Sequence, residues 1–147
     1  MKRTLSTPRT LLALLTAVVL AYALAVPAIA STSRHGILSV TKECSNYAGG
    51  AGDHCTVTSS NLNAIPVGAT VVYTSAADFV ALELHSDLVI NARGANAIYG
   101  HVDLDLVTGI GTVILSGGTG QFEKFSGTVA VAPLGGADFG WYGTYSY

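Results

Sequence analysis

Two segments in the middle of the chain alternate between apolar and polar side chains, and this alternation constrains the fold more than any other feature. Most even-numbered positions of residues 82–90 and 98–106 carry a branched apolar side chain. Because successive side chains of a β-strand point to opposite faces, each segment is predicted to be a strand with one apolar and one polar face. The apolar faces consist of Leu82, Leu84, Leu88 and Ile90 in the first segment and of Ile98, Val102, Leu104 and Leu106 in the second.

The two segments are predicted to pair as an antiparallel hairpin with a turn centred near Gly94. In this register the apolar face of one strand adjoins the apolar face of the other, as a shared core requires. The facing polar pairs are Glu83 with Asp105, His85 with Asp103 and Asp87 with His101. We call the polar face of the hairpin the polar ladder; it consists of Glu83, His85, Asp87, Tyr99, His101, Asp103 and Asp105.

The rest of the chain beyond residue 30 consists of short runs of β-branched and apolar residues separated by Gly, Asn, Ser and Pro. Such runs predict strands joined by turns. The predicted strands are residues 36–43, 55–59, 69–75, 80–90, 98–107, 111–115, 126–132 and 140–147. About eight short strands with almost no helical periodicity predict an all-β domain, either a closed barrel or a sandwich.

The first thirty residues have the organisation of a secretory signal peptide. A basic start precedes an apolar run over residues 11–26, and a small-x-small pattern ends at Ala30. These features predict a signal peptide over residues 1–30 that is cleaved after Ala30. The alternative is an uncleaved membrane anchor, but the run is shorter than the roughly 20 residues that a spanning helix needs. We therefore expect a secreted, extracellular protein whose mature chain, residues 31–147, is a single domain.

The predicted mature chain is acidic. It has four basic residues, Arg34, Lys42, Arg93 and Lys124, against nine acidic residues, and therefore a net charge of −5. The basic residues are scattered along the sequence and form no cluster in it. A sparse, acidic surface argues against nucleic acid as a partner, and against a membrane partner once the signal peptide is removed.

Cys44 and Cys55 are the two cysteines of the chain, and they enclose a segment rich in Gly, Ser, Asn and Asp. In an exported chain such a pair predicts one disulfide across this loop. Closing a loop of this size stabilises a fold by about 3 kcal/mol in the chain-entropy model. The alternative is a metal site that both cysteines form with His54, although adjacent His and Cys side chains rarely face one ion.

Residues 100–131, GHVDLDLVTGIGTVILSGGTGQFEKFSGTVAV, and the ending WYGTYSY carry a recognisable pattern. It comprises a strand ending in Asp, a Thr-Gly turn, a second strand, S-G-G-T-G-x-F and a later G-x-V-x-V. This pattern resembles the allene oxide cyclase barrel-like and dirigent-like superfamily, particularly its small secreted bacterial members. The likeness covers residues 100–147 best and is looser over residues 36–91.

The resemblance implies an eight-stranded antiparallel, calycin-like β-barrel with an interior cavity, which often assembles as a trimer. Plant relatives cyclise an unsaturated fatty-acid epoxide or direct the stereochemistry of phenoxy-radical coupling. No catalytic residue is carried over, because the strands that hold those residues do not align with this chain. In the matching segment, Gly117, Gly118 and Gly120 are expected to form a strand-to-strand corner, and Phe122 and Phe125 to plug a barrel end.

The polar ladder is the main candidate for chemistry. If it lines the barrel lumen, it offers a carboxylate–histidine base or a nitrogen- and oxygen-rich metal site. If it faces solvent, it is the hydrated outer surface of a barrel whose interior is filled by apolar side chains. The candidate catalytic residues are Glu83, His85, Asp87, His101 and Asp103, and the candidate ligand-binding residues are Tyr99, Asp105, Trp141 and Tyr145. No cofactor and no resident metal is assigned, since no dinucleotide-binding, zinc-protease or EF-hand motif occurs.

Three functions remain open from the sequence. The first is a secreted barrel that binds a small, mostly apolar ligand without converting it. The second is a cyclase, isomerase or coupling-directing enzyme whose cavity holds a reactive intermediate in one conformer. The third is a non-enzymatic surface or interaction protein with a solid barrel. A cavity separates the first two from the third, and turnover separates the second from the first.

Overall fold

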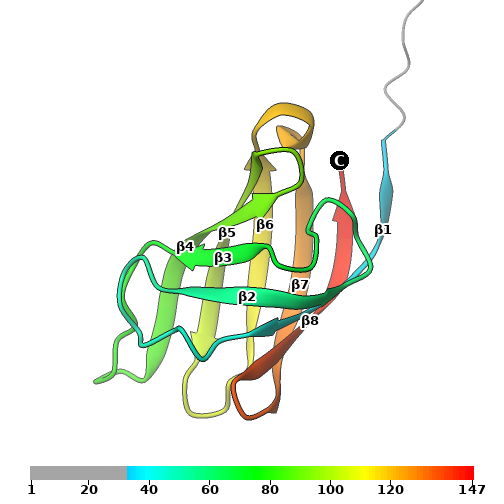
Figure 1. The fold of residues 1–147 in the computed structure, drawn as a ribbon. Helices are drawn as coiled ribbons and strands as arrows, with labels where there is room; N and C mark the ends of the chain where they lie inside the picture. The colour runs from blue at the N-terminus through cyan, green and yellow to red at the C-terminus, as the bar shows by residue number, and fades with distance from the viewer. Residues whose placement is uncertain (1–32) are drawn as a thin grey trace, which may run out of the picture. The chain divides into compact units, whose positions relative to one another are not determined.

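Eight strands run through residues 33–147, the part of the chain that the computed structural model describes, and each pairs antiparallel with the next. The strands are β1 (His35–Glu43), β2 (His54–Ser60), β3 (Thr70–Tyr73), β4 (Glu83–Ala92), β5 (Asn96–Asp105), β6 (Gly111–Gly118), β7 (Ser126–Gly135) and β8 (Asp138–Ser146). Because β8 also pairs with β1, the sheet closes into a barrel (Figure 1). The predicted fold class is confirmed, and every predicted strand begins and ends within three residues of the observed strand.

The hairpin of β4 and β5 has the predicted register. Its polar pairs are Glu83–Asp105, His85–Asp103 and Asp87–His101. On both strands the apolar face is buried, whereas the polar side chains alternate with it and point outward. Burial of one face fixes this register, because a slip by one residue would turn the whole apolar set to solvent.

The start of this hairpin differs from the prediction. The sequence predicts Leu82 on the apolar face of the strand, but β4 begins at Glu83 and Leu82 is 44% exposed. The carboxylate of Asp78 accepts hydrogen bonds from the backbone N–H groups of Val80 and Ala81, each at 2.8 Å. Leu82 then has a φ of 59°, a left-handed conformation that interrupts strand alternation. A local bond from a side chain to the backbone therefore overrides the apolar pattern.

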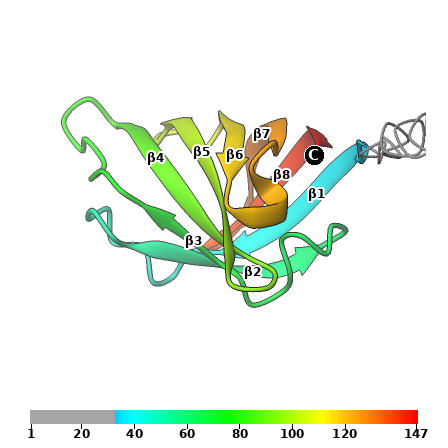
Figure 2. The same cartoon turned by 90° about the horizontal axis from the view of Figure 1, so that it is seen from above.

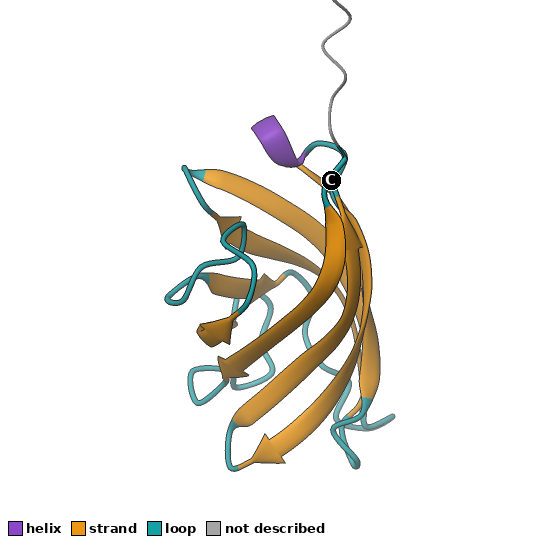
Figure 3. Ribbon diagram, turned by 90° about the vertical axis from the view of Figure 1, so that its right-hand side faces the viewer, coloured by secondary structure: helices purple, strands orange, loops and turns teal. Residues whose placement is uncertain are grey.

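Apolar side chains fill the barrel interior. Figure 2, which looks onto the barrel from one end, shows the strands arranged around this core. The largest fully buried side chains include Trp141, Phe122, Phe125, Leu38, Ile65, Leu84 and Leu88. The 3-10 turn η1 (Gly120–Phe122) lies between β6 and β7 at one end of the barrel (Figure 3). It carries Phe122, which is buried in the core. Phe122 and Phe125 are each 1% exposed, so the predicted aromatic plug is confirmed.

Two glycines make the predicted corner before η1 possible. Gly117 has a φ of 81°, which residues other than glycine rarely adopt. At Gly118 a Cβ atom would lie 2.3 Å from the backbone oxygen of Ala97, so only glycine allows the two chains to approach this closely. The glycines therefore have a structural role in turning the chain from β6 into η1.

The loops alternate between the two ends of the barrel, because each strand reverses the direction of the one before it (Figure 1). We call one end the Tyr147 end; it is formed by residues 34, 61–69, 93–95, 119–125 and 147. We call the other the disulfide end; it is formed by residues 44–53, 74–82, 106–110 and 136–137. Backbone hydrogen bonds of 2.7 and 2.8 Å pair Arg34 with Tyr147.

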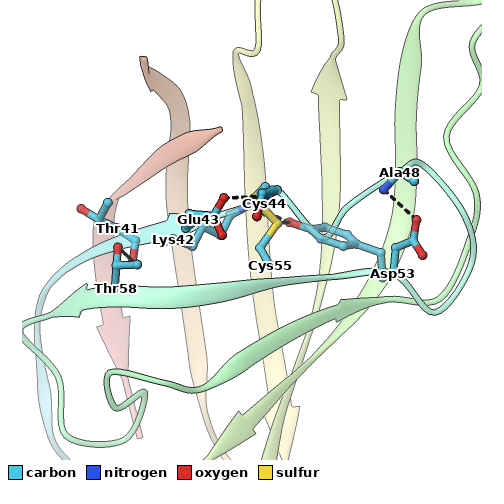
Figure 4. The surroundings of a disulfide bond; sticks show 10 residues. Thr41, Lys42, Glu43, Cys44, Ala48, Asp53, Cys55 and Thr58 are labelled. Atoms are coloured by element: carbon cyan, nitrogen blue, oxygen red, sulfur yellow. Dashed lines mark hydrogen bonds between the residues drawn. A yellow bond between two sulfur atoms is a disulfide. The ribbon is translucent and has the colours of Figure 1, made fainter. Parts of the chain in front are cut away.

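A disulfide between Cys44 and Cys55 ties the end of β1 to the start of β2 (Figure 4). The disulfide prediction is confirmed, and the alternative metal site with His54 is wrong, because the two sulfurs bond to each other. Such a bond is compatible with an exported protein. No helix within residues 33–147 is long and apolar enough to cross a membrane. The predicted signal peptide and its cleavage site after Ala30 lie outside the described residues.

Gly143 of β8 is the glycine with the least room for a side chain. A Cβ atom there would lie 1.9 Å from the backbone oxygen of Thr128 and 2.7 Å from Cα of Val129, both on β7. Because these are backbone atoms, we expect Gly143→Ala to push β7 and β8 apart. The free energy of unfolding should fall by about 1–3 kcal/mol, as overpacking does elsewhere. Urea denaturation, monitored by tryptophan fluorescence, measures this loss.

Gly140→Ala on the same strand is the matched control. Its Cβ would meet only the side chain of Leu134, at 3.4 Å, and should be accommodated. Equal destabilisation by the two substitutions would contradict the assignment of the close approach to Gly143.

Candidate functional site

The polar ladder lies on the outside of the barrel. The side chains of Glu83, His85, Asp87, His101 and Asp103 are 45–78% exposed. The opposite faces of β4 and β5 are buried in the core. Of the two arrangements that the sequence leaves open, the structure shows the solvent-facing one.

Five side chains of the ladder form one continuous chain of contacts. His85 lies between two carboxylates, with Nδ1 2.5 Å from Oδ1 of Asp103 and Nε2 3.0 Å from Oε2 of Glu83. His101 also lies between two carboxylates, with Nδ1 2.8 Å from Oδ1 of Asp87 and Nε2 3.4 Å from Oδ1 of Asp103. Asp103 is therefore the central member, in contact with both imidazole rings.

These contacts favour protonated imidazoles and ionised carboxylates. Hydrogen bonds to Asp103 and Glu83 raise the pKa of His85, and the hydrogen bond to Asp87 raises the pKa of His101. The hydrogen bond from His85 lowers the pKa of Asp103. Since carboxylates occupy both nitrogens of each ring, neither imidazole presents a free nitrogen to a substrate. The network is therefore not arranged as a general base in the structure.

Asp105 and Tyr99, two of the predicted ligand-binding residues, do not belong to this hydrogen-bonded network. The carboxylate of Asp105 accepts hydrogen bonds from the backbone N–H groups of Val107 and Thr108, at 2.8 and 2.9 Å. The bond from Thr108 is the main cause of the lowered pKa of Asp105. Tyr99 is 41% exposed on the outer face of β5, opposite Val89 of β4. Asp105 thus shapes the turn between β5 and β6, and Tyr99 lies on the exterior.

The other two predicted ligand-binding residues, Trp141 and Tyr145, lie on β8. Trp141 is 2% exposed and belongs to the core. Tyr145 is half-buried, and its ring stacks on Phe125 with ring centres 6.0 Å apart. Tyr147 extends this cluster, 5.4 Å from the ring of Phe122. The aromatic ending is therefore mainly a packed cluster at the Tyr147 end.

Lys42 of β1 lies inside the barrel, although a charged residue is expected at the surface. It is 4% exposed, and its Nζ donates a hydrogen bond to Oη of Tyr73 at 2.7 Å. The disulfide lies beside it, with Sγ of Cys44 at 3.4 Å and Sγ of Cys55 at 3.5 Å (Figure 4). Even-numbered residues of β1 from Leu38 onward point inward, so strict alternation would have predicted this position.

The surroundings of Lys42 act on its charge in opposite directions. Burial disfavours the ammonium form and lowers the pKa of Lys42 to about 7. The rings of Tyr73, Phe139 and Trp141, 5.2–5.4 Å from Nζ, favour the cation in part. A lysine that is neutral near pH 7 can act as a base or nucleophile. These rings and the disulfide surround the amine, so we assign it to the barrel interior rather than to a substrate site.

A cavity of about 260 Å³ opens at the Tyr147 end of the barrel. It is lined by Arg34, Asn63, Ala64, Arg93, Gln121, Phe122 and Tyr147. The backbone N–H of Arg93 donates to the carbonyl of Ala64 at 3.1 Å, and Arg34 is paired with Tyr147. The backbones of both arginines are thus held in place beside one cavity. Their guanidinium groups make this cavity suited to an anion.

The arginine-lined cavity could not be found from the sequence, because Arg34 and Arg93 are far apart in it and meet only when the barrel closes. The closing sheet brings the start of β1 and the turn after β4 to the same end. No protein-family model matches the chain, and no curated protein matches it. Function is therefore inferred from the chain's own side chains and their geometry.

The buried amine of Lys42 makes the stability of the barrel depend on pH. Its ordinary pKa is 10.5 and its folded pKa about 7, so between these values the unfolded chain binds a proton that the folded chain has released. Stability should therefore rise from pH 7 to pH 10, by about 4 kcal/mol from this group. Above pH 10 the trend reverses, because burial raises the pKa of Tyr73 and the unfolded chain loses that phenolic proton first. Urea denaturation at a series of pH values measures both trends.

Lys42→Met isolates the contribution of this amine and should flatten the rise between pH 7 and pH 10. Lys124→Met, at an exposed lysine, is the matched control and should keep the rise. If Lys42→Met showed the same pH dependence as the unsubstituted protein, the low pKa of Lys42 would be refuted.

Proposed function

We propose that this chain is a secreted, allene oxide cyclase-like or dirigent-like barrel protein that binds a small organic anion at its Tyr147 end without converting it. The observation that carries the proposal is the cavity of about 260 Å³ beside Arg34 and Arg93. The inferred ligand is a carboxylate with a mostly apolar body. Its charged group would meet the two guanidinium groups, and its body would lie against the ring of Tyr147.

The composition of the cavity supports this ligand class. Two of the four basic residues after residue 30 line this one cavity. Guanidinium groups bind carboxylates through paired, charge-assisted hydrogen bonds. Asn63 and Gln121 add neutral hydrogen-bonding groups, and the half-buried Tyr147 adds ring surface. The volume is slightly below the usual range for drug-sized ligands, which favours a small molecule.

The family and export parts of the proposal are supported by the sequence. Residues 100–131 carry the allene oxide cyclase-like and dirigent-like pattern, and the eight-stranded barrel agrees with that resemblance. The first thirty residues have the organisation of a signal peptide, and cleavage after Ala30 would release the chain to the exterior. The Cys44–Cys55 disulfide agrees with an oxidising compartment.

Binding is favoured over catalysis by the placement of the titratable groups. The residues that line the cavity include no histidine and no acidic side chain. The carboxylate–histidine network lies on the barrel exterior. A cyclase or coupling-directing activity would therefore have to arise from cavity shape. Product formed from an unsaturated fatty-acid epoxide or from phenoxy radicals would favour that alternative.

The interaction-protein alternative is supported by the disulfide end of the barrel. There Phe79, Val80, Val107 and Ile110 are 59–96% exposed, although all are apolar, and Leu134 near the adjoining end of β7 is 60% exposed. Exposed apolar side chains, where they adjoin one another, mark association surfaces. The resemblance implies trimers, so a second copy of the chain is the partner that this alternative predicts. If this alternative is correct, light scattering on the protein eluted from a size-exclusion column would show a trimer.

Native mass spectrometry and calorimetry on the exported protein test the proposed anion binding. The probes are decanoate and 4-hydroxycinnamate, each compared with its uncharged amide. We expect one molecule of at least one acid per chain, bound at least tenfold more tightly than its amide. A hydrogen bond to a charged group is worth about 1.5–3 kcal/mol, which accounts for this ratio. A protein that stays bare at millimolar acid would contradict the proposal.

Substitutions at the cavity separate specific binding from general attraction. Arg34→Ala and Arg93→Ala should each weaken binding of the acid at least tenfold. Lys124→Ala is the matched control, because Lys124 lies at the same end but does not line the cavity. Equal weakening by all three substitutions would indicate attraction to net charge and would contradict a built site.

A further inference from the structure

Two histidines on the polar ladder each turn one ring nitrogen toward a shared carboxylate. Nδ1 of His85 lies 2.5 Å, and Nε2 of His101 3.4 Å, from Oδ1 of Asp103. One ligand atom from each of the three residues lies within 4.8 Å of the others. We propose that His85, His101 and Asp103 form a binding site on the barrel exterior for a divalent late transition metal ion such as Zn²⁺.

The other ring nitrogen of each histidine is held by a further carboxylate. Oε2 of Glu83 lies 3.0 Å from Nε2 of His85, and Oδ1 of Asp87 lies 2.8 Å from Nδ1 of His101. A metal-bound histidine almost always donates its second ring N–H to such a partner, which fixes the ring orientation and the tautomer. The ladder therefore contains both the metal ligands and the outer carboxylates that orient them.

Strand pairing in the barrel wall holds the backbones of these residues close together in a fixed register. His85 and Asp103 face each other across β4 and β5, and the pair of Asp87 and His101 follows on the same face. A tetrahedral site with metal–ligand bonds of about 2.0–2.2 Å places neighbouring ligand atoms roughly 3.3–3.6 Å apart. The three ligand side chains are 45–58% exposed, so they can shift to this spacing without disturbing the core.

The charge and the donor types favour a transition metal over other cations. A metal ion binds neutral imidazole, so Zn²⁺ would replace the protons on the two ring nitrogens that face Asp103. The carboxylates of Glu83, Asp87 and Asp103 then leave three negative charges together, of which the divalent ion offsets two. Two nitrogens and one carboxylate oxygen suit Zn²⁺, Ni²⁺ or Cu²⁺, whereas Ca²⁺ and Mg²⁺ take oxygen ligands. Three protein ligands on an exposed face leave further positions open to water. This site does not depend on the anion cavity or on the proposed function.

Calorimetric titration with ZnSO₄ tests the proposal on the full chain, expressed without a histidine tag and treated with a chelator. We expect one Zn²⁺ per chain and binding of Ca²⁺ at least a hundredfold weaker. His85→Ala and His101→Ala should each weaken Zn²⁺ binding at least tenfold. His35→Ala removes an exposed histidine from β1 and is the matched control, which should keep the affinity.

Two further measurements distinguish a built site from loose association. Glu83→Gln and Asp87→Asn, which remove only the outer carboxylates, should weaken Zn²⁺ binding by about tenfold or more. In NMR spectra, Zn²⁺ should shift the imidazole signals of His85 and His101 and leave that of His35 in place. Thermal unfolding of each variant without metal checks that the barrel is intact.

The proposal would be overturned by any of three results. These are no Zn²⁺ binding up to millimolar concentration, affinity that survives the double substitution of His85 and His101 by Ala, or equal affinity for Zn²⁺ and Ca²⁺. The last result would identify a diffuse acidic surface. Loss of anion binding at Arg34 and Arg93 would leave the metal site unaffected, so the two proposals fail separately.

Discussion

Closure of the sheet by the pairing of β1 with β8 is the constraint on which the rest of the structure depends. Nine consecutive residue pairs join these strands, from His35–Ser146 to Glu43–Asp138. Closure removes the free edges of the sheet and gives every strand one face toward the core and one toward solvent. The apolar side chains decide which face of a strand is inside, and each remaining residue then takes the face that its position along the strand gives it. For this reason the imidazoles of the ladder lie in solvent, whereas the amine of Lys42 lies in the core.

The ladder is the part of the molecule that the sequence predicts best, and the reason is physical. Each of the two strands has one apolar and one polar face, and a short turn at residues 93–95 joins them. Only one register then buries both apolar faces, so the facing polar pairs could be predicted residue by residue. Alternation alone did not decide which face lines the lumen; that follows from the closed barrel, whose interior the apolar side chains fill. The hydrogen bonds within the ladder depend on side-chain rotamers, which a sequence pattern does not contain.

The failures of sequence reasoning have different causes. Leu82 fits the apolar pattern, but the carboxylate of Asp78 caps the preceding backbone and turns Leu82 out of the strand. Lys42 fits the inward pattern, but lysine is rarely buried, because the ammonium group loses its hydration there. It is tolerated because Tyr73 accepts its hydrogen bond and because loss of its proton removes the charge. No local sequence pattern predicts that Arg34 and Arg93 line the same cavity, since only the closed barrel brings them together.

Closure also separates the charges along the barrel, and this bears on how an acidic protein could bind an anion. Eight of the nine acidic residues lie on the polar ladder or around the disulfide end. Arg34, Arg93 and Lys124 lie at the Tyr147 end, with Glu123 as their acidic neighbour. At physiological ionic strength charges are screened over about 8 Å, whereas a nine-residue strand spans about 30 Å. A small anion at the Tyr147 end therefore meets mainly the local arginines, and a cation on the ladder meets mainly the local carboxylates. The negative net charge of the chain thus does not decide the sign of either ligand, because each site is governed by the charges within one screening length of it.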